Sequence, residues 1–237
     1  MSIRLVDCTL RDGGYINDWK FGYRTAKSVI QKLVDSNADY VEVGFLRNCS
    51  YDKNATLFNN IAELKKILPR EQKNTKFTVM ALHNKYDITK LEPNDGTVEA
   101  VRVTFHDYDI DEGLEFVKKV MEKGYKCFCN PINIMGYSDQ EILNLIQKIN
   151  QIKPYAFSIV DTFGSMIKSD LLRIYSLLEH NLDKSIVIGL HLHENLSLSY
   201  SLAQEFIGMR NVNRDCVIDG SLMGMGRVPG NLCLELI

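Results

Sequence analysis

Short apolar runs alternate with amphipathic stretches along the whole chain. The runs have the length and the composition of buried strands, whereas the stretches between them carry apolar residues at helical spacing. Strands are expected at residues 3–9, 40–45, 76–82, 100–105, 126–130, 156–161, 186–193 and 215–221.

The stretches between the strands carry helix signals. Ser138 and Ser169 are expected N-caps, because a serine hydroxyl accepts a hydrogen bond from the first turn of a helix. Residues 84–98 show little helical pattern and predict an irregular or one-turn connection. Helices are expected at residues 24–36, 56–68, 111–123, 139–151, 169–181 and 196–209.

Strand and helix alternate through eight predicted strands, which indicates parallel βαβ units in one α/β domain over residues 1–237. This number of strands favours a closed (β/α)8 TIM barrel over an open, doubly wound sheet. No G-x-G-x-x-G follows the first strand, which weakens the dinucleotide-binding alternative.

The chain reaches Ile237 where the helix after the eighth strand should begin. A barrel without that helix leaves apolar surface on its last and first strands uncovered. We therefore expect a barrel truncated around the eighth helix. Either the natural polypeptide continues beyond Ile237 into an additional C-terminal domain, or a partner subunit of a homo-oligomer covers the seam.

Composition narrows the classes of partner. A hydrophobic fraction of 45% and a charged fraction of 24% are typical of a globular domain. The net charge is −2 without a basic cluster, so neither nucleic acid nor a membrane surface is expected as a partner. The N-terminus shows no signal-peptide pattern, and the six scattered cysteines are expected to be reduced, as in a cytoplasmic protein.

The pair His191 and His193 stands at the end of a predicted strand. Alternate residues of a strand point to the same face, so both imidazoles are expected at one spot. Two imidazoles suit a divalent metal if a carboxylate or amide completes the set. The alternative is one histidine bonded in the core and one facing solvent.

The first predicted strand, residues 3–9, is followed closely by Arg11 and Asp12 and then by Gly13 and Gly14. Arg11 would reach an anion and Asp12 a cation, and the glycines would let the backbone approach a ligand closely. The alternative is an ordinary strand-to-loop junction with a surface ion pair.

Other strand ends also carry polar residues, as expected where a barrel gathers its reactive groups. Glu42 would point into the barrel and needs a partner, for which Arg11 is the candidate. Asp161 and Thr162 would either bind a substrate or cap the next helix. His83 and His106 are read first as structural or rim histidines. Asn130, Asn195 and Asn231 stand at further strand ends.

Three motifs in order carry a family resemblance: Thr9-Leu-Arg-Asp-Gly13, His191-x-His193 with Asn195, and Gly224-Met-Gly-Arg-Val-Pro-Gly-Asn231. The chain resembles the DRE-TIM metallolyase (HMGL-like) superfamily over its whole length. Within it, the stretches around the last two strands are most similar to the 4-hydroxy-2-oxovalerate aldolases.

The resemblance implies a divalent metal, Mn²⁺ or Mg²⁺, held by Asp12, His191 and His193, with Asn231 as a further ligand. It also implies cleavage of a small 2-oxo acid to a pyruvate enolate, whose charge Arg11 shares with the metal. The candidates for contacting this substrate are Glu42, Asp161, Thr162 and Asn195.

The chain departs from the aldolase pattern at Tyr15, where those aldolases carry a histidine assigned as the general base. Tyrosine has a pKa of about 10 and is a poor base at neutral pH. His106 is the alternative base. Two further functions stay open: a Claisen-type synthase joining an acyl-CoA to a 2-oxo acid, and a barrel that binds a 2-oxo acid without catalysis.

Overall fold

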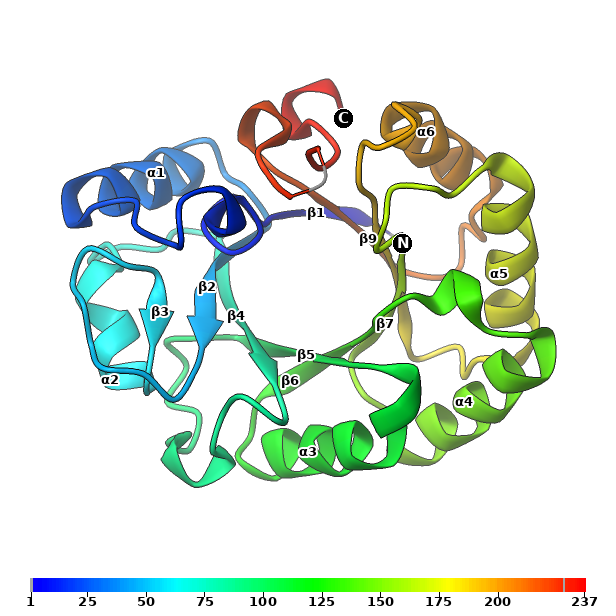
Figure 1. Ribbon diagram of the computed structural model, residues 1–237, viewed down its shortest axis with the longest axis horizontal. Helices are drawn as coiled ribbons and strands as arrows, with labels where there is room; N and C mark the ends of the chain where they lie inside the picture. Colours follow the sequence, from blue (N-terminus) through cyan, green and yellow to red (C-terminus); the bar gives the residue numbers. More distant parts are fainter. Residues whose placement is uncertain (1, 228) are drawn as a thin grey trace.

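The predicted (β/α)8 barrel is confirmed by the computed structural model, which describes residues 2–227 and 229–237. Eight parallel strands form a ring viewed end-on in Figure 1, and pairing of Val6 with Tyr40 closes it. The barrel strands are β1 (Ile3–Asp7), β2 (Tyr40–Leu46), β4 (Lys76–Leu82), β5 (Ala100–Phe105), β6 (Lys126–Pro131), β7 (Ala156–Val160), β8 (Val187–His191) and β9 (Cys216–Gly220).

Helices surround this ring in Figure 1 and cover its outer surface. Apolar helix faces and outward strand residues form one continuous core between the two layers. None of the described helices is long and apolar enough to span a membrane. The helices are α1 (Tyr23–Asp35), α2 (Ile61–Leu64), α3 (Ile110–Glu122), α4 (Asp139–Ile152), α5 (Lys168–Asn181) and α6 (Ser199–Met209).

The helix predicted at residues 56–68 was wrong in its first part. Leu57–Phe58 forms a short strand, β3, that pairs with the end of β2. The helix begins only after Asn60, whose side chain accepts a hydrogen bond from the backbone N–H of Glu63. An N-cap at this position sets the start of the helix later than the apolar pattern indicated.

Of the two predicted serine caps, one is confirmed and one is wrong. Ser138 caps α4, and the Glu141 carboxylate accepts a hydrogen bond from the backbone N–H of Ser138. Ser169 lies inside α5, where the Asp170 carboxylate accepts from the backbone N–H of Ile167 instead. α5 therefore begins at Lys168, one residue before Ser169, with Ile167 as its N-cap.

Two 3₁₀ turns, Leu222–Gly224 and Leu234–Leu236, follow β9. Figure 1 shows this last segment in the gap between α1 and α6. Leu232 is fully buried there, whereas Leu236 is 59% exposed. The expected apolar seam is therefore covered in part by the chain itself.

The interior of the barrel is divided into layers. One end is closed by an apolar plug that includes Tyr40, Ala100 and Phe128. Glu42 and Arg102 stand two residues further along their strands, so they form a charged layer above the plug. The six cysteines are all free thiols, as expected.

Candidate metal and substrate site

The loop after β1 brings Arg11 and Asp12 into the barrel, where both are buried. The indole Nε1 of Trp19 donates a hydrogen bond to the carbonyl oxygen of Arg11 at 2.7 Å. Trp19 fits here because residue 14 is glycine: a Cβ on Gly14 would lie 2.0 Å from the indole ring. The space beside Gly14 thus holds a protein side chain, not the ligand expected from the sequence.

His191 is the last residue of β8, and His193 lies beyond the strand. The prediction of a strand through His193 was wrong, because the chain pairs His193 with Asn231 in an antiparallel bridge. The two imidazole centroids are 5.0 Å apart, with their planes at 89°. The histidines therefore lie together, but the loop after β9 sets the position of the second one.

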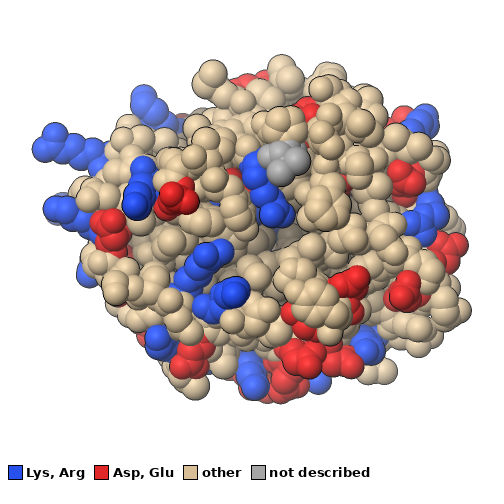
Figure 2. All heavy atoms as spheres, viewed as in Figure 1, with Lys and Arg blue, Asp and Glu red and all other residues tan. Residues whose placement is uncertain are grey.

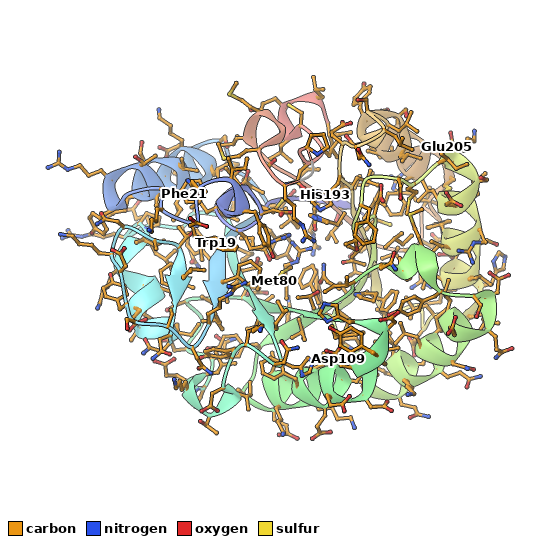
Figure 3. The ribbon with its side chains drawn as sticks, viewed as in Figure 1. Trp19, Phe21, Met80, Asp109, His193 and Glu205 are labelled. Carbon is orange, nitrogen blue, oxygen red and sulfur yellow. The ribbon has the colours of Figure 1, made fainter. Side chains whose placement is uncertain are left out.

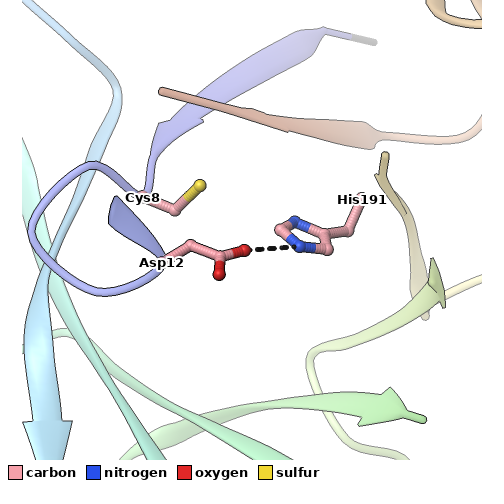
Figure 4. Close-up of side chains that lie close together, drawn as sticks. All are labelled: Cys8, Asp12 and His191. Carbon is pink, nitrogen blue, oxygen red and sulfur yellow. Dashed lines mark hydrogen bonds and ion pairs between the residues drawn. The ribbon is translucent and has the colours of Figure 1, made fainter. Parts of the chain in front are cut away.

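The Asp12 carboxylate lies against both imidazoles. Figure 3 shows His193 on the side of the ring next to the C-terminal segment. Oδ2 of Asp12 is 3.1 Å from Nε2 of His191, the contact drawn in Figure 4, and 3.6 Å from Nε2 of His193. Oδ1 of Asp12 is buried without a hydrogen-bond partner, as is Oδ1 of Asn231. Buried acceptors without a donor are costly, so this arrangement suits a bound cation.

Hydrogen bonds at Nδ1 orient both rings. Nδ1 of His191 donates to Asp219 at 2.9 Å, and Nδ1 of His193 donates to the carbonyl of Arg227 at 3.1 Å. Nε2 of His193 then presents a lone pair toward Asp12, whereas Nε2 of His191 donates to Asp12, and a cation would take the place of that proton. Two imidazoles, a carboxylate and an amide oxygen are a donor set that divalent transition metals accept.

Neighbouring charges set the protonation states of the site. Burial favours neutral Asp12, but the Arg11 guanidinium and the hydrogen bond from His191 hold its pKa well below the usual range. Burial and the adjacent His191 lower the pKa of His193 to about 4. Asp12 is therefore ionised and His193 neutral near pH 7, as metal ligands must be. Burial would lower the pKa of His191, but its hydrogen bonds to Asp12 and Asp219 raise it, so a metal would have to displace the proton on its Nε2.

Cys8 also lies in this group. Its Sγ and ligand atoms of Asp12 and His191 all lie within 4.8 Å of one another (Figure 4). The thiol donates to the carbonyl of Gly220 at 3.1 Å, and burial raises the pKa of Cys8. Since a metal binds the thiolate, the imidazole and oxygen donors fit a cation better than Cys8 does.

A chain of buried ion pairs lies beneath these groups. Nε of Arg11 is 2.7 Å from Glu42, which confirms the expected pair. Glu42 also contacts Nη1 of Arg102 at 3.3 Å, and Arg102 contacts Asp219, the partner of His191. The two sides of the site, Arg11 and His191, are thus connected through alternating charges.

Sequence reasoning missed Arg102 and Asp219, although a signal for both was present. Each is a charged residue inside an otherwise apolar strand. Ala100 and Val217 line the barrel interior, and side chains two residues further along a strand share that face. Inward-facing charges in buried strands need partners, and the nearest complementary ones are each other.

A cavity of about 150 Å³ opens at this end of the barrel. This volume lies below the ~300–1,000 Å³ that is typical of pockets for drug-sized ligands, so the cavity suits a small molecule. No acidic residue of the described chain lines it. The lining residues are Arg11, Tyr15, Phe45, Met80, Leu82, Thr104, His106, Asn130, Ile132, Val160, Thr162, His191, His193 and Arg227.

The HMGL-like family matches residues 2–237 of the chain. The protein belongs to this family. A relative named 4-hydroxy-2-oxovalerate aldolase, from Geobacillus genomosp. 3, is 24% identical over 242 residues, covering 100% of this chain and 69% of the relative.

Two solved structures have the same fold. One is the N-terminal domain of a Bacteroides vulgatus protein described provisionally as an aldolase: its TM-score is 0.79 at 24% identity, over 98% of this chain and 77% of that one. The other is a Bacillus subtilis HMG-CoA lyase, with a TM-score of 0.73 at 16% identity, over 99% of this chain and 83% of the lyase.

Both candidate bases of this HMGL-like protein line the cavity. Nδ1 of His106 is 3.4 Å from the Asp109 carboxylate, which also contacts Nε2 of His83 at 2.8 Å. Figure 3 shows Asp109 on the α3 side of the barrel. Tyr15 packs its ring 4.7 Å from Trp19 and is 37% exposed. Of these two side chains, His106 has a carboxylate in position to orient it, and Tyr15 has none among the described residues.

The four expected substrate-binding residues of the HMGL-like protein are placed differently. Thr162 lines the cavity, and its Oγ1 accepts from the backbone N–H of Asn133 at 2.7 Å. The Asp161 carboxylate accepts from the backbone N–H groups of Ser165 and Met166, which lie in the loop before α5, so it does not cap that helix. Asn195 is exposed outside the cavity lining, and Glu42 lies behind Arg11.

Proposed function

We propose that this HMGL-like protein is a divalent-metal-dependent aldolase that cleaves or forms a 4-hydroxy-2-oxo acid. The observation that carries the proposal is the group of possible metal ligands beside Arg11 in a small cavity: Nε2 of His191 and Nε2 of His193 lie 3.1 and 3.6 Å from the Asp12 carboxylate, whose Oδ1 has no hydrogen-bond partner. The relatives named 4-hydroxy-2-oxovalerate aldolase support the same chemistry.

Asp12, His191, His193 and Asn231 would hold the metal, which supplies Lewis-acid polarisation of the 2-oxo group when bound. Arg11 would donate to the oxygen that gains negative charge as the carbon–carbon bond breaks. Its ion pairs with Glu42 and Asp12 fix the guanidinium in advance, so little reorganisation is needed during the reaction.

His106 would act as the general base. In cleavage, the proton of the 4-hydroxyl passes to its Nε2, a carbonyl forms on the departing aldehyde, and the electron pair of the broken bond stays with the pyruvate half. Asp109, held by His83, would keep the other proton of His106 on Nδ1. Tyr15 would orient the substrate from the opposite wall.

Pyruvate release from a panel of 4-hydroxy-2-oxo acids tests the proposal. Activity is expected with Mn²⁺ or Mg²⁺ and is expected to disappear on chelation. The small cavity is not matched to an acyl-CoA, so condensation of acetyl-CoA with a 2-oxo acid is expected to fail. Consumption of the thioester without aldol cleavage would indicate that the protein is a synthase and not an aldolase. Binding of pyruvate without turnover of any substrate would replace it with a non-catalytic barrel.

A further inference from the structure

Two arginines beside the cavity, Arg47 and Arg227, have no carboxylate within ion-pair distance in the part of the chain that the structure describes. The Nε atom of each is buried without a hydrogen-bond partner. A buried guanidinium donor that lacks an acceptor is costly to the fold. Both side chains are therefore suited to an anion that the protein itself does not supply.

The two guanidinium groups lie on one aromatic cluster, formed by Tyr15, Trp19 and Phe45. Arg227 lies 4.9 Å from the Tyr15 ring centroid. Cζ of Arg47 lies 4.9 Å from the centroid of the Trp19 ring and 5.0 Å from the centroid of the Phe45 ring. A guanidinium stacked on a ring keeps its edge free, so its N–H groups stay available for a carboxylate or phosphate.

This cluster forms part of the cavity wall, because Tyr15, Phe45 and Arg227 line the cavity. Arg11, also in the wall, is already paired with Asp12 and Glu42. Figure 2 shows Lys and Arg side chains bordering the central hollow of this face, while most acidic side chains lie nearer its periphery. A cleft lined by one sign of charge attracts ligands of the opposite sign.

We infer that Arg227, assisted by Arg47, binds an anionic group on the aldehyde half of the substrate. This inference rests on the proposed function, since it assigns the other end of the same substrate. The carboxylate of the 2-oxo acid would lie at the Asp12–His191–His193 group, and a second carboxylate or a phosphate would lie at the guanidinium of Arg227, whose backbone carbonyl contacts His193. The cavity volume of about 150 Å³ restricts the spacer between the two acidic groups to a few carbons.

Anion binding is tested on the full chain without any reaction. Titration calorimetry with inorganic phosphate and with succinate would compare the protein with Arg227→Gln and Arg47→Gln. Arg70→Gln, at an exposed arginine away from the cavity, is the matched control. Since a hydrogen bond to a charged group contributes about 1.5–3 kcal/mol, Arg227→Gln is expected to weaken binding roughly ten- to hundredfold. Affinities equal to the control, with unchanged melting temperatures, would overturn the inference.

A second assay compares aldehydes in the metal-loaded protein, in the direction that joins them to pyruvate. The pairs are 4-oxobutanoate against butanal, and glyceraldehyde 3-phosphate against glyceraldehyde. The anionic member of at least one pair is expected to have the higher kcat/KM, and the pair that shows it distinguishes carboxylate from phosphate. Arg227→Gln should reduce that preference at least tenfold, whereas Arg70→Gln should keep it. A preference that survives in Arg227→Gln would overturn the inference.

The two experiments separate the inference from the proposed function. If no aldehyde reacts but anion binding still depends on Arg227, the aldolase proposal fails while the anion site stands. If aldehydes react and anionic and neutral members are equivalent, the aldolase proposal stands and the anion site is refuted.

Discussion

Asp219 accepts a hydrogen bond from Nδ1 of His191 at 2.9 Å, so β9 decides which nitrogen of His191 faces Asp12. Asp219 itself is buried, and Arg102 holds it in the ionised form: burial would raise its pKa, but the guanidinium charge lowers it to about 2. The orientation of His191, a proposed metal ligand, thus depends on a residue on a neighbouring strand and, through it, on a third strand.

Asp219→Asn tests this dependence. The amide has no charge to favour the Nδ1–H form of His191, so metal affinity is expected to fall about ten- to hundredfold, as for other groups that orient ligands. Calorimetric titration with Mn²⁺ measures the change in affinity. A single cooperative melting transition in circular dichroism would show that the variant is still folded. An unchanged Mn²⁺ affinity would show that Asp219 does not position His191.

The ligand set itself is tested by Asp12→Ala and by the double variant His191→Ala/His193→Ala. Both are expected to lose Mn²⁺ binding, measured by electron paramagnetic resonance of free Mn²⁺, while the barrel remains folded. Cys8→Ser serves as the comparison and should retain the metal, because its thiol is occupied by Gly220. Tight Mn²⁺ binding in the double variant would contradict the assignment.

His106→Asn and Tyr15→Phe distinguish the two candidate bases. Removal of a general base costs about 10²–10⁴ in rate, so His106→Asn should lose kcat on that scale and Tyr15→Phe much less. Asp109→Asn should cause a smaller loss and shift the pH–rate profile, since Asp109 orients His106. A large loss confined to Tyr15→Phe would reverse the assignment.

Arg102→Met tests the buried charge layer. It would leave Glu42 and Asp219 without their shared partner, and breaking a buried pair from one side costs about 3–5 kcal/mol of unfolding free energy. The exposed pair Arg173–Asp139 offers the control: Arg173→Met should cost less than about 1 kcal/mol. Urea unfolding of both variants gives the comparison, and equal losses would argue against a structural role for the layer.

Asp7 introduces a pH dependence of stability. Burial raises its pKa to about 7 from 3.8, so the folded protein keeps Asp7 protonated over a range in which the unfolded chain has released the proton. The resulting stabilisation is complete below pH 4 and is lost as the pH rises to about 7, at about 1.4 kcal/mol per pKa unit.

The variant Asp7→Asn has no proton to lose, so its stability relative to the natural protein should increase between pH 5 and pH 8. Urea unfolding at the two pH values measures the difference. Glu112→Gln, at an exposed carboxylate on α3, should show no such trend. A pH-independent difference for Asp7→Asn would mean that Asp7 is ionised in the folded protein.

Most of the candidate site residues that the sequence predicted stand at or just after the C-terminal ends of strands. Arg11, Asp12, His191 and His193 were predicted from local patterns to lie together, and they do, because parallel strands in a barrel bring their C-terminal ends to one face. The pair Arg11–Glu42 was also predictable, since a buried glutamate requires a cation.

Alternation of apolar and amphipathic segments was sufficient to determine the eight strands and the barrel, because strand and helix periods are local properties of the chain. Tertiary structure alone decided which charges meet. Asp219 accepts a hydrogen bond from His191, and the bridge to Asn231 fixes the backbone position of His193. Asp109 contacts both His106 and His83. All of these contacts join separate strands and loops. Such contacts depend on the register and closure of the barrel, which no local pattern encodes.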